Sequence, residues 1–274
     1  MNIAVLSGKG GTGKTFISVN LAVAQNATYI DCDVEEPNGR LFLKPVDCKE
    51  NPVYTVLPEF NENKCIGCRK CVDFCRFNAL VYIKNKPIVF PDVCHACGGC
   101  SLICPTGAVT EAMRQIGSVE QGKHRKTDVV TGILNIGEAS GVAVIKKALE
   151  TGLQLNYNTV IDCPPGSGCA VMESVSASDL CIIVVEPTAF GFHNFKMVYR
   201  LVKLLGKPCY IIINKEDSPY PQLDKFCAEN GLPILCRIPF DSKTALLLAN
   251  GELLYGKNTY YTDLFMKIVC EVKS

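Results

Sequence analysis

The sequence predicts an α/β fold in which a mainly parallel sheet is flanked by helices, interrupted by a smaller α+β domain rich in cysteine. The chain opens as strand, glycine-rich loop, helix and strand over 3–6, 8–15, 15–25 and 28–30, an order that builds parallel sheets. Largely apolar runs at 159–162, 180–185 and 210–213 suit strands that helices cover on both faces. Between these segments, eight of the 17 cysteines fall within 65–104, which predicts a separate inserted domain.

Length and charge narrow the possible functions. A chain of 274 residues can bury one large core and hold a small second domain. The net charge of +1 gives no electrostatic case for binding nucleic acid. No uninterrupted apolar stretch reaches the length of a membrane span, and the opening residues lack a basic leader. We therefore expect a cytoplasmic protein without a membrane span, and cysteines that bind metal rather than form disulfides.

The remaining segments complete the predicted organisation. Residues 1–58 and 113–274 are predicted to form the larger domain, and residues 59–112 the insert. In the larger domain we expect strands at 53–57 and 128–136, and helices at 143–151, 193–205, 223–230 and 243–250. In the insert we expect short strands at 80–83 and 87–90. Because so small a unit lacks a sufficient apolar core, metal clusters are expected to hold it together.

The glycine-rich loop matches the phosphate-binding pattern G-x-x-x-x-G-K-[ST]. Its residues are Gly8, Lys9, Gly10, Gly11, Thr12, Gly13, Lys14 and Thr15. In a P-loop the backbone amides cradle phosphates at a helix N-terminus. Lys14 is then expected to reach the β- and γ-phosphates, and the Thr15 hydroxyl to bind Mg²⁺. The pattern predicts an ATP site.

The second lysine of the loop, Lys9, makes it resemble the deviant Walker A loop of the MinD/Mrp/nitrogenase iron protein family. The resemblance implies a homodimer that sandwiches two ATP molecules, with Lys9 reaching the partner's nucleotide. It also implies that Asp33 positions the attacking water and that Asp162, at the end of a strand, binds Mg²⁺ through water. Gly166 corresponds to the switch II glycine that senses the γ-phosphate, and Asn214 to the asparagine that binds the base. We therefore expect Mg²⁺-dependent ATP hydrolysis, with Lys9, Lys14, Asp33 and Asp162 as the catalytic residues.

The cysteines of the insert form two runs with the spacing C-x2-C-x2-C-x3-C. This is the pattern of two-cluster bacterial ferredoxins, in which the fourth cysteine of each run ligates the other run's cluster. The first [4Fe–4S] cluster is then expected on Cys65, Cys68, Cys71 and Cys104, and the second on Cys75, Cys94, Cys97 and Cys100. Two structural zinc sites are the alternative. Arg76 stands where a proline usually follows the fourth cysteine, so the two clusters are expected to differ.

The whole arrangement resembles MinD-superfamily ATPases that contain an inserted ferredoxin domain. The first hypothesis is an ATP-gated electron carrier that acts on a redox partner protein. The second is an ATPase that assembles or carries iron–sulfur clusters or another metallocofactor, as in the Mrp group, with Cys163 and Cys169 as candidates for a labile site. The third is a MinD-like spatial regulator at a membrane surface. It ranks last because the amphipathic stretch at 260–272 lacks a basic face.

Overall fold

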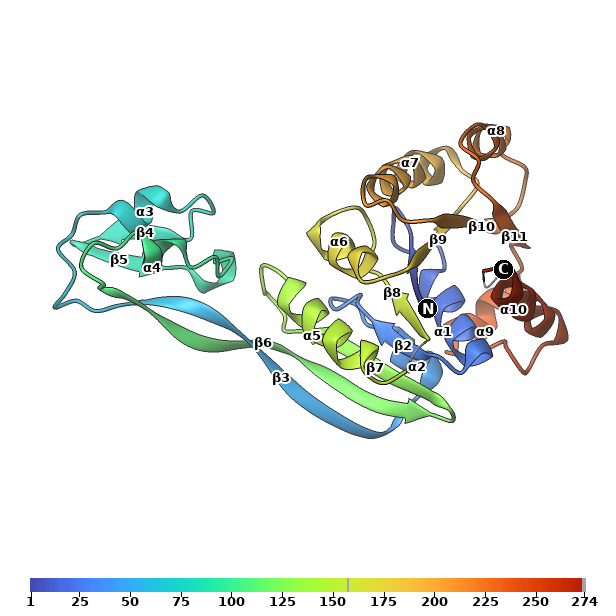
Figure 1. Cartoon of the computed structure of the whole chain (residues 1–274), viewed down its shortest axis with the longest axis horizontal. Helices are drawn as coiled ribbons and strands as arrows, with labels where there is room; N and C mark the ends of the chain where they lie inside the picture. The colour runs from blue at the N-terminus through green and yellow to red at the C-terminus, as the bar shows by residue number, and fades with distance from the viewer. Residues whose placement is uncertain (157, 273–274) are drawn as a thin grey trace.

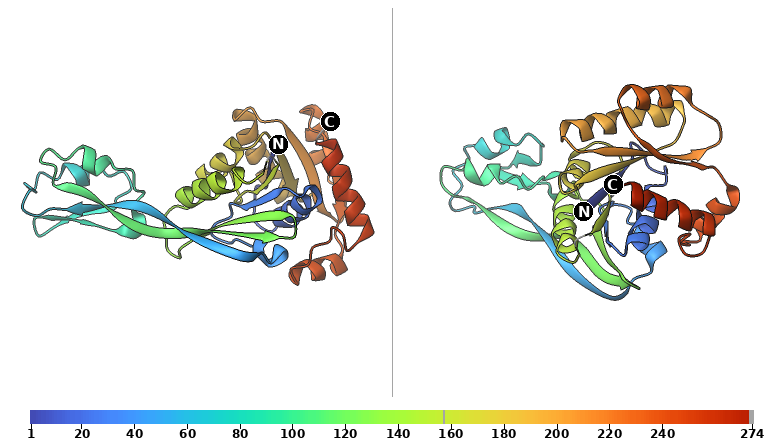
Figure 2. Two further views of the ribbon diagram at one scale, coloured as in Figure 1. Left: turned by 60° about the horizontal axis from the view of Figure 1, so that its bottom comes forward. Right: turned by 45° about the vertical axis from the view of Figure 1, so that its right-hand side comes forward.

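The fold is seen in a computed structural model that describes residues 1–156 and 158–272. Residue 157 and the last two residues of the predicted 113–274 segment lie outside that part of the chain. A large α/β body and a small module are joined by a long two-stranded ribbon (Figure 1). The two further views show the same separation of module and body (Figure 2).

A mixed sheet of nine strands, counted over the described residues, forms the centre of the body. Its order is β11-β10-β9-β1-β8-β2-β7-β6-β3, and the seven strands from β11 to β7 run parallel. The parallel strands are β1 (Asn2–Leu6), β2 (Thr28–Asp31), β7 (Thr127–Leu134), β8 (Thr159–Asp162), β9 (Leu180–Val185), β10 (Cys209–Glu216) and β11 (Ile234–Pro239). Strands such as β9, buried at every position, confirm the prediction drawn from the apolar runs.

Helices cover both faces of this sheet and form one apolar core on each side. One core contains residues of α5 (Val142–Leu153), α6 (Cys169–Ser176), α7 (Ala189–Leu204) and α8 (Pro221–Glu229). The other contains residues of α1 (Lys14–Gln25), α2 (Gly39–Leu43), α9 (Ser242–Ala249) and α10 (Thr259–Glu271). The carboxyl ends of β1, β2 and β8 therefore meet at one edge of the sheet, where the P-loop begins.

The ribbon consists of β3 (Val46–Phe60) and β6 (Val109–His124), which pair antiparallel along almost their whole length. At its far end lies the module, with α3 (Lys70–Phe74), β4 (Leu80–Ile83), β5 (Lys86–Val89), the 3-10 helix η1 (Pro91–Val93) and α4 (Gly99–Leu102). Strands β4 and β5 form a hairpin turned by Lys84 and Asn85, both at positive φ. The module occupies the predicted insert, and the two hairpin strands agree with the predicted ones to within a residue.

The ribbon itself is longer than the sequence predicts. We predicted one strand at 53–57 and named no strand over 109–124, and the predicted boundaries at 58/59 and 112/113 fall inside β3 and β6. Most of the first half of β3 is exposed, so it lacks the apolar alternation that marks a half-buried strand. Backbone pairing between the two strands holds the ribbon together, and a residue pattern does not reveal such pairing.

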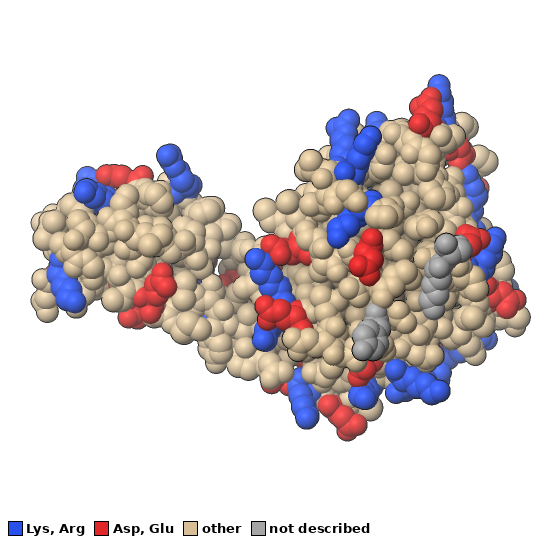
Figure 3. All heavy atoms as spheres, in the orientation of Figure 1, with Lys and Arg blue, Asp and Glu red and all other residues tan. Residues whose placement is uncertain are grey.

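The distribution of charge over the surface and the length of the apolar helices bear on possible partners. Lys, Arg, Asp and Glu are interspersed on the face seen in Figure 3, without one large patch of a single sign. Among the described residues, no helix combines the length and apolar character needed to cross a membrane.

Candidate functional site

The P-loop connects β1 to α1 and brings its lysine next to an acid from β2. Gly13 caps α1 with φ of 96°, a left-handed conformation that favours glycine. Lys14, the first residue of α1, is buried, and its Nζ lies 3.6 Å from Oδ2 of Asp33. An open cavity of about 1070 Å³ is lined by Gly10, Gly11, Gly13, Lys14, Thr15 and Asp33 together with residues of α2, α5 and α9. The cavity is therefore lined by five of the eight predicted loop residues, and Gly8, Lys9 and Thr12 are not part of its lining.

Asp162 and Asp31 end the neighbouring strands β8 and β2, and Tyr29 bridges them. The Tyr29 hydroxyl lies 2.9 Å from Oδ2 of Asp162 and 3.2 Å from Oδ2 of Asp31, and all three side chains are buried. The backbone N–H groups of Gly39 and Asp33 also donate to Asp31, at 2.9 and 3.2 Å. The other oxygen of Asp162, Oδ1, is buried without a hydrogen-bond partner among the described residues.

Burial is the main influence on the pKa values of Asp31 and Asp162. Burial, together with the charge of Asp162, raises the pKa of Asp31 well above its usual value. Burial also raises the pKa of Asp162, but Lys14 opposes that effect. Lys14 is the cation that opposes the rise at Asp162, so it favours the ionised form of that carboxylate. An ionised Asp162 with one free oxygen fits the predicted role of holding a hydrated Mg²⁺.

Asp33 is less buried than Asp31 and Asp162, and the shift in its pKa is smaller than that of Asp31. Burial raises the pKa of Asp33 to about 6, and the charge of Lys14 limits the rise. At neutral pH its carboxylate is ionised and lies at the wall of the cavity beside Lys14. A carboxylate at this place can accept a hydrogen bond from a water molecule next to a terminal phosphate.

Lys9, the lysine that marks the deviant loop, is held within its own chain. Its Nζ contacts Oε2 of Glu186, while Lys215 approaches Oε1 of the same carboxylate at 3.2 Å. Burial works to raise the pKa of Glu186, but hydrogen bonds from the two lysines outweigh it and keep that pKa below its usual value. Lys215 also donates to the carbonyl of Gly11, at 2.5 Å. In the single chain, Lys9 therefore rests on Glu186.

Two other predicted residues, Asn214 and Gly166, form hydrogen bonds with the loop or the residue before it and do not line the cavity. Asn214 donates from Nδ2 to the carbonyl of Thr12, at 2.7 Å, and is buried. The N–H of Gly166 donates to the carbonyl of Ser7, at 3.0 Å. Both bonds tie the loop to the strand ends behind it. Binding of the base by Asn214 and of the γ-phosphate by Gly166 therefore remain predictions.

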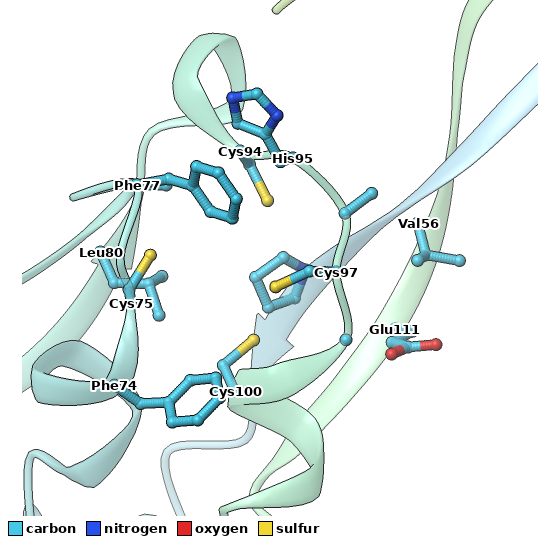
Figure 4. Close-up of a pocket in the computed structure, with 14 residues that line it drawn as sticks. Val56, Phe74, Cys75, Phe77, Leu80, Cys94, His95, Cys97, Cys100 and Glu111 are labelled. Atoms are coloured by element: carbon cyan, nitrogen blue, oxygen red, sulfur yellow. The ribbon is translucent and has the colours of Figure 1, made fainter. Parts of the chain in front are cut away.

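In the module, the eight cysteines of the two runs come together as two sets of four. One hollow is lined by Cys65, Cys68, Cys71 and Cys104, and a second by Cys75, Cys94, Cys97 and Cys100. Figure 4 shows the four sulfur atoms of the second hollow turned toward a common space. These are the two sets that the sequence spacing predicts, each with one cysteine from the other run.

The two hollows differ in their surroundings. Arg69 and Lys70 line the first, with the Arg69 guanidinium 5.3 Å from the Tyr82 ring centroid. His95 and Glu111 line the second, where the His95 ring stacks on Phe77 at 4.0 Å between centroids. The N–H of Ala108 donates to Sγ of Cys104, at 3.2 Å, a contact that favours a thiolate. The donor sets therefore fit thiolate-bound clusters in unequal environments.

Among the described residues, no group of three or more His, Cys, Asp or Glu side chains lies close enough together to hold one metal ion. The sequence prediction concerns clusters of several iron atoms, so cluster binding remains a prediction.

Comparison with known proteins shows the family. A model described as the CobQ/CobB/MinD/ParA nucleotide binding domain matches residues 3–254. The chain belongs to this family. The resemblance predicted from Lys9 and the strand-end acids is thereby confirmed at the level of the MinD/ParA superfamily, and the α/β nucleotide-binding fold with it.

Relatives of this MinD/ParA-type chain include an uncharacterized protein of Methanocaldococcus jannaschii. The two are 30% identical over 282 residues, which cover 100% of this chain and 96% of the relative. The fold is similar to MinD of Pyrococcus horikoshii, solved with Mg-ADP, at a TM-score of 0.60 and 18% identity, over 100% and 96% of the two chains. A shorter match, 40% identical over 62 residues, covers 22% of this chain and 9% of indolepyruvate oxidoreductase subunit IorA of Pyrococcus horikoshii.

The sequence did not reveal two residues of this MinD/ParA-type site. Tyr29 lies in an apolar strand like any core residue, and its partner Asp162 is 133 residues away. Glu186 directly follows β9, and no local pattern links it to Lys9. An acid directly after a buried parallel strand was the available signal for Glu186, and no such signal existed for Tyr29.

Proposed function

We propose that this protein is a Mg²⁺-dependent ATPase that dimerises across its nucleotide site and gates electron transfer from two [4Fe–4S] clusters to a partner protein. The observation that carries the proposal is that the eight cysteines line two hollows, four to each, in the module. The ribbon that carries this module is continuous with the nucleotide-binding sheet. The cavity around Lys14 and Asp33 and the free oxygen of Asp162 support the ATPase part.

Two residues of the cavity, Lys14 and Asp33, have different roles in the proposed hydrolysis. Lys14 neutralises phosphate charge, and Asp33 orients the water that attacks the γ-phosphorus as its bond to the bridging oxygen breaks. ATP and water thus yield ADP and phosphate. Lys9 must leave Glu186 to reach a partner subunit's nucleotide, so dimer formation includes the loss of that ion pair. The four cysteines of each hollow would hold one cluster, which would supply one-electron redox chemistry when bound.

Assembly or carriage of metal centres is the alternative, and the placement of two cysteines weighs against it. Cys163 is buried in the core, whereas Cys169 is exposed at the start of α6. A buried thiol is inaccessible to an acceptor, so this pair lacks the character of a labile cluster site.

A MinD-like role at a membrane surface is supported by the structural neighbours only at the level of the fold. The apolar face of the C-terminal helix is already used: Tyr261, Phe265, Ile268 and Val269 of α10 pack in the core with Phe16. A helix packed in this way does not present the free amphipathic face that interfacial binding needs.

One experiment separates electron transfer from metal transfer. Reduced protein, purified without oxygen, is mixed with cytochrome c as the electron acceptor and with an apo-ferredoxin as the iron acceptor, with Mg-ATP or Mg-ADP. We expect ATP to change the rate of cytochrome reduction while iron stays on the protein. Lys14→Ala, the matched control, should remove the difference between nucleotides. ATP-dependent movement of iron to the apo-ferredoxin would instead establish the assembly role.

A further inference from the structure

The ribbon leaves the body at a defined irregularity. Strand β6 lies between β3 and β7 from Gly117 onward, whereas its residues 109–115 pair with β3 alone. At the point of exit Val53 opposes Gly117 and Tyr54 opposes Gln115, so Ile116 has no opposite residue on β3. Such a β-bulge bends the strand and increases its twist. The part of the ribbon that pairs outside the larger sheet begins at this bulge, and the module lies at the far end of the ribbon (Figure 1).

The loop between β7 and α5 clamps the ribbon at the bulge. The N–H of Asn135 donates to the carbonyl of Ile116, at 2.8 Å, and its Nδ2 donates to the carbonyl of Gln115, at 3.3 Å. Just beyond the bulge, the Arg114 guanidinium forms an ion pair with Glu138 of the same loop. The Glu138 side chain is only 9% exposed, so the pair is partly withdrawn from solvent. The loop therefore holds the first projecting residues of β6 by three contacts.

The same loop is in contact with the nucleotide site through Val34. Val34 follows Asp33, and both line the nucleotide cavity. The Val34 carbonyl accepts a hydrogen bond from the N–H of Leu134, at 2.9 Å. Its side chain packs so closely on Gly132 and Gly141 that a Cβ on either would come within 2.6 or 2.5 Å of it. Packing this tight makes the loop follow any displacement of Val34.

We propose that Arg114 and Glu138 are positioning residues that transmit the state of the Asp33–Val34 segment to the ribbon and so set where the cysteine module stands. The proposal deepens the proposed function, on which it rests for the use of that module. A terminal phosphate beside Asp33 attracts Lys14 away from the acid and shifts the segment. Val34 then moves the loop, and the ion pair carries the shift to the ribbon beyond the bulge.

Hydrogen–deuterium exchange of the full chain, purified without oxygen, tests this with Mg²⁺ and the non-hydrolysable analogue AMPPNP as the probe. We expect nucleotide to slow amide exchange in the P-loop and to change exchange over 109–116 and 54–60 roughly fivefold or more, the lower end of typical coupling between sites. Glu138→Gln and Arg114→Gln should each remove most of the ribbon response and leave P-loop protection intact. The double variant should lose no more than either single variant, because both break one pair.

Asp128→Asn provides the matched control. It removes a carboxylate that pairs with Lys123 of β6 at 3.5 Å in the part of the strand that is anchored to β7. We expect its ribbon response to equal that of the wild type. Two results would overturn the proposal. In one, nucleotide slows amide exchange in the wild-type P-loop but leaves exchange in the ribbon unchanged. In the other, nucleotide changes ribbon exchange in Glu138→Gln as much as in the wild type. Amide exchange can be measured whether or not iron is bound. If the purified protein contains no iron but its ribbon still responds to nucleotide, the proposed clusters are refuted and the proposed coupling is not.

Discussion

Replacing Tyr29 by phenylalanine tests how the Mg²⁺-binding carboxylate is held in place. The variant keeps the buried ring and removes only the hydroxyl that lies 2.9 Å from Oδ2 of Asp162. The other oxygen of Asp162, Oδ1, has no hydrogen-bond partner among the described residues. Without the Tyr29 hydroxyl the carboxylate can rotate, and Oδ2 loses its donor in a place that water does not reach.

The magnitude follows from the type of bond. Hydrogen bonds to charged groups contribute about 1.5–3 kcal/mol. Since about 1.4 kcal/mol corresponds to a factor of ten, full expression of this loss weakens metal binding by roughly ten- to a hundredfold. We expect the lower end, because a rotated carboxylate still carries its charge. Electron paramagnetic resonance of free Mn²⁺, titrated with the protein and ADP, measures the affinity directly.

Tyr261→Phe is the control for the loss of a buried tyrosine hydroxyl. Tyr261 is also buried, but its hydroxyl lies 3.4 Å from Thr244 and away from the metal-binding carboxylate. We expect Mn²⁺ affinity to stay within twofold of the wild type in this variant. If Tyr29→Phe, folded as judged by thermal unfolding, also binds Mn²⁺ within twofold of the wild type, the hydroxyl does not position Asp162.

Three other changes test the remaining parts of the site. Lys9→Ala should abolish ATP hydrolysis, because Lys9 is proposed to reach the partner subunit's nucleotide. Nucleotide binding should stay within a fewfold of the wild type, because Lys9 contacts Glu186 and does not line the cavity; turnover retained in this variant would argue against a sandwich dimer. The kcat/KM for ATP should fall as the pH drops through about 6, because protonation of Asp33 removes the carboxylate that orients water; a pH profile flat between 5 and 7.5 would contradict this role. The wild type should hold roughly eight irons per chain by colorimetric iron and sulfide analysis, and Cys97→Ala should lose about half while Cys48→Ala, at an exposed ribbon position outside both hollows, keeps them all; zinc in place of iron would exclude the clusters.

Local pattern predicted much of the body and of the site. The P-loop was predictable because a phosphate cradle needs glycines, a lysine and a hydroxyl at fixed spacing on one turn. The parallel strands were predictable because burial on both faces demands continuous apolar runs, as in β9. Asp33 and Asp162 were predicted from the family resemblance, and the structure brings both close to Lys14.

Contacts between distant segments escaped prediction. Strands β3 and β6 of the ribbon have few buried positions in their projecting parts, and they are held by backbone pairing, which depends little on side-chain type. Glu186 is joined to Lys9 by packing alone, across 177 positions by their numbering. Both features belong to the fold as a whole, so no short stretch of sequence carries their pattern.

The sequence by itself determined the nucleotide-binding loop, the parallel core and the grouping of eight cysteines into two sets, because each depends on side-chain type at short spacing. Only the tertiary structure decided that the cysteine module stands on a ribbon anchored beside Asp33 and Val34, and that Tyr29 holds Asp162. These features arise where strands far apart in the chain are brought edge to edge, and there geometry, not residue type, sets which atoms meet.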